Sequence, residues 1–195
     1  MQTLPDTIIS IALGVIFLTI LISGVLLKRK GRDFAGAAPV HPVLYKTGKI
    51  CSFLLWITLF IVPIHPELYQ FIPGIFFNTF AWMKWTAAAI SVAASLILII
   101  SFHTLGDSLK FGLPRGERGV FRKSGLYRFS RNPMYFAFAL ISTAIVLYLP
   151  GFLILFSAVF SFYVHHQIIL AEEAYMRITW GDQYGDYMRK VRRYI

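Results

Sequence analysis

The chain contains a stretch of 40 residues, 132–171, without a single Asp, Glu, Lys or Arg. One helix needs about 20 apolar residues to cross a lipid bilayer, so this run is too long for a single membrane helix. Pro150 and Gly151 lie near its middle, and such a dipeptide is typical of a turn. The run therefore predicts two membrane-spanning helices joined as a tight hairpin.

Three more apolar segments precede this hairpin. They cover residues 8–27, 50–64 and 85–102. The second is short, and it spans the membrane only if the flanking Lys49 extends its ammonium group to the interface. Because 57% of the residues are hydrophobic and 14% are charged, the composition is that of a polytopic membrane protein. We predict an all-α polytopic membrane protein with five transmembrane helices, the last two a tight hairpin, and a cytoplasmic C-terminal helix.

The basic residues test this number of spans. Of the 19 Lys and Arg residues, 18 lie between the first two spans, between the third and fourth, or after the fifth. Five spans place all three segments on one face, which the positive-inside rule makes cytoplasmic, with the N-terminus outside. The net charge of +10 is then explained by topology among membrane phospholipids, and we expect no nucleic-acid partner.

Cysteine and histidine content bears on metal sites. Cys51 is the single cysteine, so the chain can form no internal disulfide and no cysteine-based zinc site. A metal site needs more ligands than the pair His165-His166, and the sequence places no others near it. We therefore expect no metal. We also expect a single membrane domain, 1–195, in which the first three spans occupy 1–102 and a functional core occupies 103–195.

Two polar blocks flank the predicted hairpin. The first, residues 125–135, reads Gly-Leu-Tyr-Arg-Phe-Ser-Arg-Asn-Pro-Met-Tyr and leads into the fourth span. The second starts with Glu172-Glu173, directly after the fifth span, and continues to Arg192-Arg193. Since neighbouring antiparallel helices bring their outer ends together, we expect residues 132–135 to lie close to the two glutamates.

The side chains of these blocks suit a ligand that carries several kinds of charge. Tyr127 and Tyr135 offer aromatic faces that attract a cation. Glu172 can accept from an ammonium or a hydroxyl group, and Arg128 and Arg131 can clamp a carboxylate. Taken singly, the arginines could equally be topology determinants and the tyrosines interface aromatics, so the prediction depends on their joint placement.

The start of the fourth span adds a further possible contact. Pro133 fits the first turn of a helix, where a missing N–H group does no harm. Asn132 would cap that helix, and the free N–H groups of its first turn could hold a carboxylate.

The form Gly-x-Tyr-x3-Arg-Asn-Pro-x-Tyr, followed after the hairpin by Glu-Glu-x7-Gly-x2-Tyr-x2-Tyr-x4-Arg-Arg, resembles the isoprenylcysteine carboxyl methyltransferase family in its short, prokaryotic five-span form. More broadly it resembles the membrane methyltransferases that include phospholipid methyltransferases. The resemblance covers residues 100–194 and makes residues 103–195 the methyltransferase core. It implies S-adenosylmethionine as methyl donor, S-adenosylhomocysteine as product, and a lipid acceptor that enters from the bilayer.

The resemblance also implies which residues bind the cofactor, in a pocket roofed by the C-terminal helix. They are Gly119, Val120, Phe121, Arg122, Gly125, Leu126, Tyr127, Asn132, Pro133, Met134, Tyr135 and Glu172.

Two departures from the family pattern concern the acceptor. Asn132 stands where the eukaryotic members carry His, and Ile168 stands where they carry an Arg that is thought to meet the substrate carboxylate. Another cation, Arg128, Arg131 or His166, would have to replace that arginine. For a phospholipid amine, which must first lose a proton, Glu173 or His166 is the candidate base.

Several functions remain open from the sequence. Carboxyl O-methylation of a C-terminal S-isoprenylcysteine is the leading prediction, and phospholipid N-methylation is the alternative within the same class. A reductase related to the sterol reductases, with a nicotinamide cofactor, is an alternative of a different class. A lipid-binding scaffold without activity is the fourth.

Overall fold

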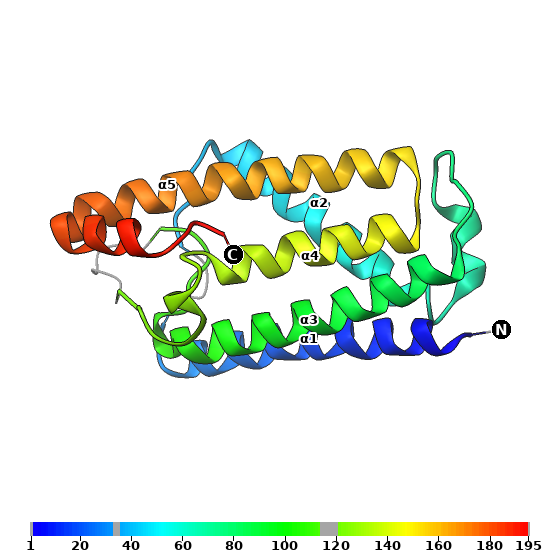
Figure 1. The fold of residues 1–195 in the computed structure, drawn as a ribbon, viewed down its shortest axis with the longest axis horizontal. Coiled ribbons are helices and arrows are strands. Elements are labelled where there is room, and N and C mark those ends of the chain that lie inside the picture. Colours follow the sequence, from blue (N-terminus) through cyan, green and yellow to red (C-terminus); the bar gives the residue numbers. More distant parts are fainter. Residues whose placement is uncertain (1, 33–35, 114–120, 195) are drawn as a thin grey trace.

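The computed structural model describes residues 2–32, 36–113 and 121–194, and these residues form α-helices and short 3-10 helices without a strand. The α-helices are α1 (Leu4–Arg29), α2 (Pro42–Ile61), α3 (Ala81–Leu105), α4 (Pro133–Tyr148) and α5 (Phe152–Lys190) (Figure 1). The 3-10 helices are η1 (Pro66–Phe71), η2 (Gly106–Ser108) and η3 (Gly125–Arg128). The predicted all-α fold class is confirmed for the described residues.

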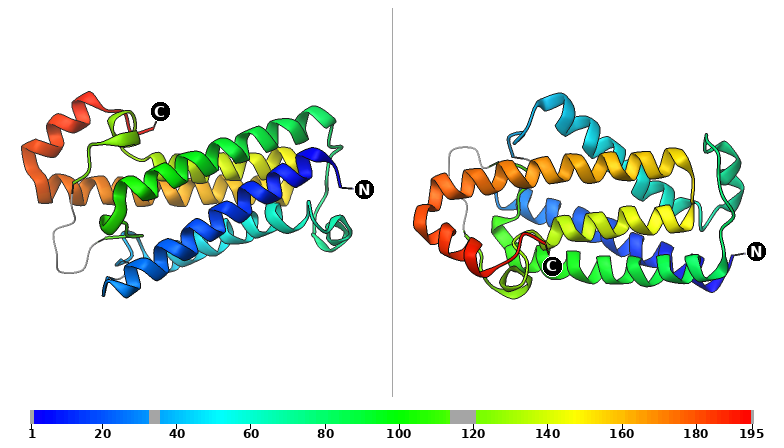
Figure 2. Two further views of the ribbon diagram at one scale, coloured as in Figure 1. Left: turned by 90° about the horizontal axis from the view of Figure 1, so that it is seen from below. Right: turned by 45° about the horizontal axis from the view of Figure 1, so that its top comes forward.

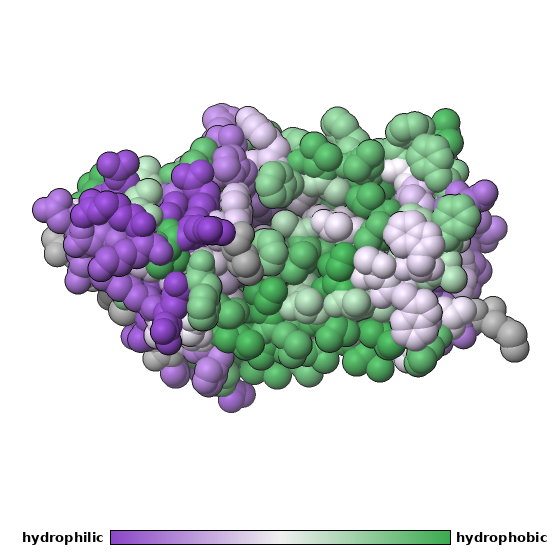
Figure 3. All heavy atoms as spheres, viewed as in Figure 1, coloured by the Kyte–Doolittle hydropathy of each residue, from purple (hydrophilic) through white to green (hydrophobic). Residues whose placement is uncertain are grey.

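Four helices, α1, α2, α3 and α5, are long and apolar enough to cross a membrane. The fifth apolar helix, α4, has 16 residues, which gives about 24 Å of helix against a hydrocarbon core of about 30 Å. Pro133 sets its start, and the turn before Phe152 sets its end. Length and composition thus support four of the five predicted spans. Figure 3 shows a broad hydrophobic surface over the middle of the bundle and hydrophilic residues towards its ends.

Helix α5 is longer than a bilayer requires. Its charge-free part, residues 152–171, has the length of one membrane span, and Glu172 is the first charged residue after it. We take residues 172–190 to lie beyond the membrane-spanning segment. At Gly181 the backbone has φ 51° and ψ −130°, which is not helical. Residues 182–190 therefore turn back as a separate helical piece towards the start of α4 (Figure 2), at the place of the predicted C-terminal helix.

Small residues allow the helices to approach closely. Ala87 and Ala94 on α3, and Ala137 and Ala144 on α4, have no solvent exposure. Lipid tails are as apolar as leucine, so close van der Waals packing, rather than the hydrophobic effect alone, holds membrane helices together. A hydroxyl adds to it, because Ser95 on α3 donates to a backbone carbonyl of α1 at 2.9 Å.

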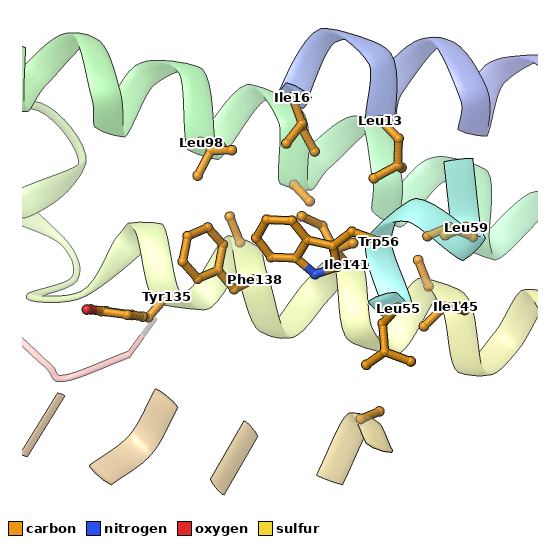
Figure 4. Packing of buried hydrophobic residues seen from close by; sticks show 14 of the residues in the cluster. Leu13, Ile16, Leu55, Trp56, Leu59, Leu98, Tyr135, Phe138, Ile141 and Ile145 are labelled. Atoms are coloured by element: carbon orange, nitrogen blue, oxygen red, sulfur yellow. The ribbon is translucent and has the colours of Figure 1, made fainter. Parts of the chain in front are cut away.

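Larger side chains fill the centre of the bundle (Figure 4). Trp56 of α2 lies 4.8 Å from the ring of Phe138 on α4, measured between ring centroids. Leu98 and Ile141 are fully buried. Tyr135 lies at one edge of this cluster (Figure 4).

Candidate functional site

A pocket of about 180 Å³ lies where α3 ends, α4 begins and α5 leaves its apolar part. It is lined by residues from four segments of the chain. They are Leu105, Ser108, Lys110, Gly112, Leu113, Phe121, Arg122, Tyr127, Arg131, Asn132, Met134, Tyr135, Glu172, Glu173, Tyr175, Met176, Tyr184 and Tyr187. The two predicted polar blocks therefore do meet, and the segment 105–113 joins them.

The carboxylate of Glu172 faces this pocket. Tyr135, in the first turn of α4, donates its hydroxyl to Glu172 Oε1 at 2.8 Å. The backbone N–H of Gly112 also donates to this carboxylate. Burial raises the pKa of Glu172 to about 7, although both hydrogen bonds and the charge of Lys49 act in the opposite direction. Among the described residues Glu172 forms no ion pair, so a cationic group of a ligand would find an unneutralised partner.

Gly112 reaches Glu172 because two distant segments pair. The N–H of Gly36 donates to the carbonyl of Phe111 at 2.7 Å, and Ala37 pairs with Leu113 in both directions. Gly112 lies between them with φ +96°, and an added Cβ would collide with the carbonyl oxygen of Ala37. This position therefore requires glycine.

The second glutamate has a different environment. Arg131 Nε donates to Glu173 Oε1 at 3.0 Å, and Arg193 holds the other oxygen at 3.0 Å. Asn132 Nδ2 donates to Oε1 at 3.1 Å. Burial alone would raise the pKa of Glu173, but the hydrogen bonds from the two arginines outweigh it and lower that pKa. Glu173 is thus a fully ionised structural partner that ties the C-terminal segment to the start of α4.

Aromatic rings cover the pocket. Phe121 lies 5.3 Å from Tyr184 and 5.1 Å from Tyr187 between ring centroids. The hydroxyl of Tyr187 donates to the carbonyl of Tyr127 at 2.6 Å, which fixes the residues after Gly181 over the 3-10 helix η3. The turn at Gly181 is what brings these rings back over the pocket.

An apolar groove of about 270 Å³ lies on the other side of Tyr135. It is lined by side chains of α1, α2, α4 and α5 together with one residue of the segment after η2. They are Phe17, Ile20, Tyr45, Lys49, Ser52, Phe53, Trp56, Phe111, Tyr135, Phe138, His165 and Ile168. Phe53 is 54% exposed, so the groove opens onto the apolar outer surface of the bundle. Tyr135 is the residue that lines both the groove and the polar pocket.

Most of the predicted cofactor residues that the structure describes line the pocket, and some do not. Phe121, Arg122, Tyr127, Asn132, Met134, Tyr135 and Glu172 line it, as do Arg131 and Glu173. Gly119 and Val120 lie outside the described residues. Gly125, Leu126 and Pro133 support the pocket walls without lining them: an added Cβ at Gly125 would touch Thr104, and Pro133 is fully buried as the first residue of α4.

Three of the predicted side chains have other surroundings than those expected, and for Asn132 the predicted capping role is wrong. Asn132 occupies the N-cap position of α4, but its side chain donates to Glu173 and does not cap the helix. Arg128 is exposed and its guanidinium lies 6.0 Å from the ring of Phe129, outside the pocket. His166 lies 2.7 Å from the hydroxyl of Tyr194 and lines neither the pocket nor the groove, but a smaller cavity beside Tyr135 and Phe138.

Sequence reasoning missed other lining residues. Lys110 and Gly112 belong to a loop with no pattern that sets them apart from their neighbours. Their predicted place on the cytoplasmic side was the one signal that could have indicated them. In the groove, the sequence predicted a snorkelling role for Lys49 at a helix end, and it placed His166 rather than His165 among the candidate site residues. A helical step of about 100° per residue separates those two histidines, so only one of them faces the groove.

A family model for phospholipid methyltransferases matches residues 82–183. The match covers α3, the segment that follows it, α4 and most of α5, and so includes Tyr135 and Glu172. No curated protein and no solved structure matches the chain in the corresponding comparisons.

Proposed function

Because the chain belongs to the phospholipid methyltransferase family, we propose that it is an S-adenosylmethionine-dependent methyltransferase acting on a lipid-linked acceptor. The family and the four helices of spanning length support an integral membrane enzyme. We propose the carboxylate of an S-isoprenylcysteine as the acceptor, with the polar pocket and the C-terminus on the cytoplasmic side.

The observation that carries this proposal is the carboxyl group of Glu172 in the pocket, which has no ion-pair partner among the described residues. S-adenosylmethionine has a free ammonium group, and an ammonium held against a buried carboxylate forms a charge-assisted hydrogen bond. The hydroxyl of Tyr135 and the N–H of Gly112 orient the carboxylate from the protein side. The remaining lone pairs of Glu172 are therefore available to the ligand.

The other lining groups fit the rest of the molecule. The faces of Tyr127 and Tyr135 suit a sulfonium cation, and the rings of Phe121, Tyr184 and Tyr187 offer apolar surface to a base. Lys110 and Arg122, which also line the pocket, would meet the cofactor carboxylate in the place for which Arg128 and Arg131 were predicted. Arg131 is already engaged by Glu173.

The bound cofactor supplies an electrophilic methyl group, which an acceptor carboxylate oxygen gains as the carbon–sulfur bond breaks, giving an ester and S-adenosylhomocysteine. A carboxylate is ionised at neutral pH, so the chain needs no general base for it. The contribution of the protein is then to orient the two reactants and exclude water between pocket and groove. Tyr135, which borders both spaces, is the residue best placed to do so.

Phospholipid N-methylation is the second candidate, favoured by the description of the matching family. Its acceptor ammonium must lose a proton to a base before it can attack. Glu173 is held by two arginines and its pKa is lowered, and His166 does not line the groove. Both predicted bases are thus poorly suited, which favours the carboxylate acceptor.

Two measurements test the proposal on protein purified in detergent. Calorimetric titration with S-adenosylhomocysteine should show binding that is lost in Glu172→Gln and retained in Glu67→Gln, where the same change is made on the exposed helix η1. Transfer of labelled methyl should then give alkali-labile product on farnesylcysteine. Alkali-stable label on phosphatidylethanolamine would favour the second candidate, and absence of cofactor binding by the wild type would refute the proposal.

A further inference from the structure

An exposed lysine, Lys49, lines the mostly apolar groove. Lys49 lies two turns after the start of α2 and lines the groove together with Phe53 and Trp56. Its Nζ donates to the hydroxyl of Tyr45 at 2.9 Å and lies 4.4 Å from the centroid of that ring. A second ring, that of Phe111, lies 5.5 Å from the ammonium. The side chain is thus held in one direction by two aromatic residues.

This arrangement leaves the charge of Lys49 incompletely satisfied. An ammonium group has three donors, and among the described residues Lys49 forms one hydrogen bond and no ion pair. Ionisable groups within membrane helices are costly, and they face cavities or partners where they occur. The comparable lysine of α3, Lys84, does have a partner, because it pairs with Asp6 at 3.2 Å.

Lys49 is also close to the polar pocket. The hydroxyl of Tyr45 donates in turn to the carbonyl of Phe111 at 3.2 Å, and the next residue, Gly112, donates to Glu172. Tyr135 forms the wall between the groove and Glu172. An anion held by Lys49 would therefore lie at the polar end of the groove, beside the wall that it shares with the cofactor pocket.

We propose that Lys49, oriented by Tyr45, binds the carboxylate of the lipid acceptor while its hydrocarbon tail lies in the groove between Phe53, Trp56 and Phe138. This inference rests on the proposed function and assigns a residue to its acceptor specificity. It provides the cation that the chain lacks at Ile168, a residue of the same groove. The apolar lining suits an isoprenoid tail, and the single cation suits a single anionic group.

The test removes the charge from the protein and from the ligand in turn. Equilibrium binding of N-acetyl-S-farnesylcysteine, a single anion, and of its uncharged carboxamide is measured without cofactor, on wild type and on Lys49→Met, Lys49→Arg and Lys46→Met. Lys46 is exposed on the same helix, as Lys49 is, but does not line the groove. We expect Lys49→Met to weaken carboxylate binding about tenfold or more, as for loss of a charged hydrogen bond, and to leave carboxamide binding unchanged.

Two control variants separate the charge at position 49 from other effects of substitution. Lys49→Arg should retain most of the carboxylate affinity, and Lys46→Met should change neither ligand. Equal weakening of carboxylate and carboxamide by Lys49→Met would show a packing role and overturn the proposal, as would no weakening of either. Binding to phosphatidylethanolamine vesicles is measured in the same way. If Lys49→Met weakened binding to these vesicles alone, Lys49 would be assigned to a phosphate and the carboxylate assignment would be overturned.

Failure of this inference can be distinguished from failure of the proposed function. S-adenosylhomocysteine binding is measured separately at pH 8.5, well above the pKa of Glu172, because the charge of Lys49 lowers that pKa. At this pH it should be the same in Lys49→Met and wild type within about threefold, since Lys49 does not line the cofactor pocket. A wild type that binds farnesylcysteine through Lys49 but does not bind S-adenosylhomocysteine would refute the cofactor assignment alone.

Discussion

The hydroxyl of Tyr135 donates a 2.8 Å hydrogen bond to Oε1 of Glu172. This contact joins the first turn of α4 to the first charged residue after the apolar part of α5. The same tyrosine ring borders the apolar groove on its other side. One side chain therefore both orients the proposed ammonium-binding carboxylate and separates the cofactor space from the lipid space.

Replacing Tyr135 by Phe tests the first of these roles. The variant keeps the aromatic wall but leaves Glu172 without one of its two protein donors, and a hydrogen bond to a charged group contributes about 1.5–3 kcal/mol. We expect S-adenosylhomocysteine to bind about tenfold more weakly in calorimetric titrations. Farnesylcysteine binding should stay within about twofold, because the groove surface is unchanged. Unaltered cofactor binding would show that the hydrogen bond does not orient Glu172.

The cluster around Glu173 predicts a stability effect. Glu173→Gln would leave the buried guanidinium of Arg131 without its counter-charge, and breaking a buried pair in this way costs about 3–5 kcal/mol. Arg193 is 34% exposed, so Arg193→Ala should cost less. Thermal unfolding in detergent should therefore rank wild type above Arg193→Ala and Arg193→Ala above Glu173→Gln. The reverse order would contradict the structural role given to Glu173.

The same cluster predicts how the stability of the folded protein changes with pH. The pKa of Glu173 is lowered in the folded protein, so its stabilising contribution is present above its ordinary pKa and is lost as the pH falls through the lower folded value. Unfolding temperatures of the wild type should therefore drop on acidification, and Glu173→Gln should show a smaller drop. An equal drop in both would assign the acid sensitivity to other groups.

The meeting of Tyr135 and Glu172 could be predicted from the sequence because it follows from one local fact. A charge-free run with a central Pro-Gly turn has to return to its starting side, so the residues at its two ends become neighbours. The donor from Gly112 could not be predicted in this way. It depends on pairing between residues 36–37 and 111–113, which lie far apart in the chain and show no periodic pattern.

The directions of individual side chains could not be predicted from the sequence either. Asn132 was correctly placed at the start of α4, yet the position alone does not say whether its amide turns to the backbone or to Glu173. Lys49 and Tyr45 lie one helical turn apart on α2, but which face of that helix meets α1 and α5 depends on how the helices pack. Arg128 ends the 3-10 helix η3 and is exposed. Arg131 lies beyond η3, where its N–H donates to the carbonyl of Arg192 and its side chain pairs with Glu173.

Gly112 offers a test of the segment pairing. In Gly112→Ala the added Cβ would collide with the carbonyl of Ala37, and φ +96° is unfavourable for any residue with a Cβ. Gly106→Ala is the matched control, because φ is also positive there but no atom lies within 4 Å of the added Cβ. We expect cofactor binding to fall below detection in Gly112→Ala and to remain in Gly106→Ala. If both variants lost cofactor binding equally, the cause would be backbone strain rather than displacement of the N–H group that donates to Glu172.

The pKa of Glu172 predicts how cofactor binding depends on pH. Burial raises this pKa to about 7 in the free protein, and a cationic ammonium binds only the ionised carboxylate. Below pH 7 binding must first remove a proton from Glu172, so the affinity for S-adenosylhomocysteine should increase about tenfold between pH 6 and pH 8 and then level off. Calorimetry in buffers of different ionisation enthalpy should show proton release near pH 6.5. In Asn132→Ala, where Glu172 is intact, this pH dependence should persist. A flat profile in the wild type would show that the ligand does not contact an ionising Glu172.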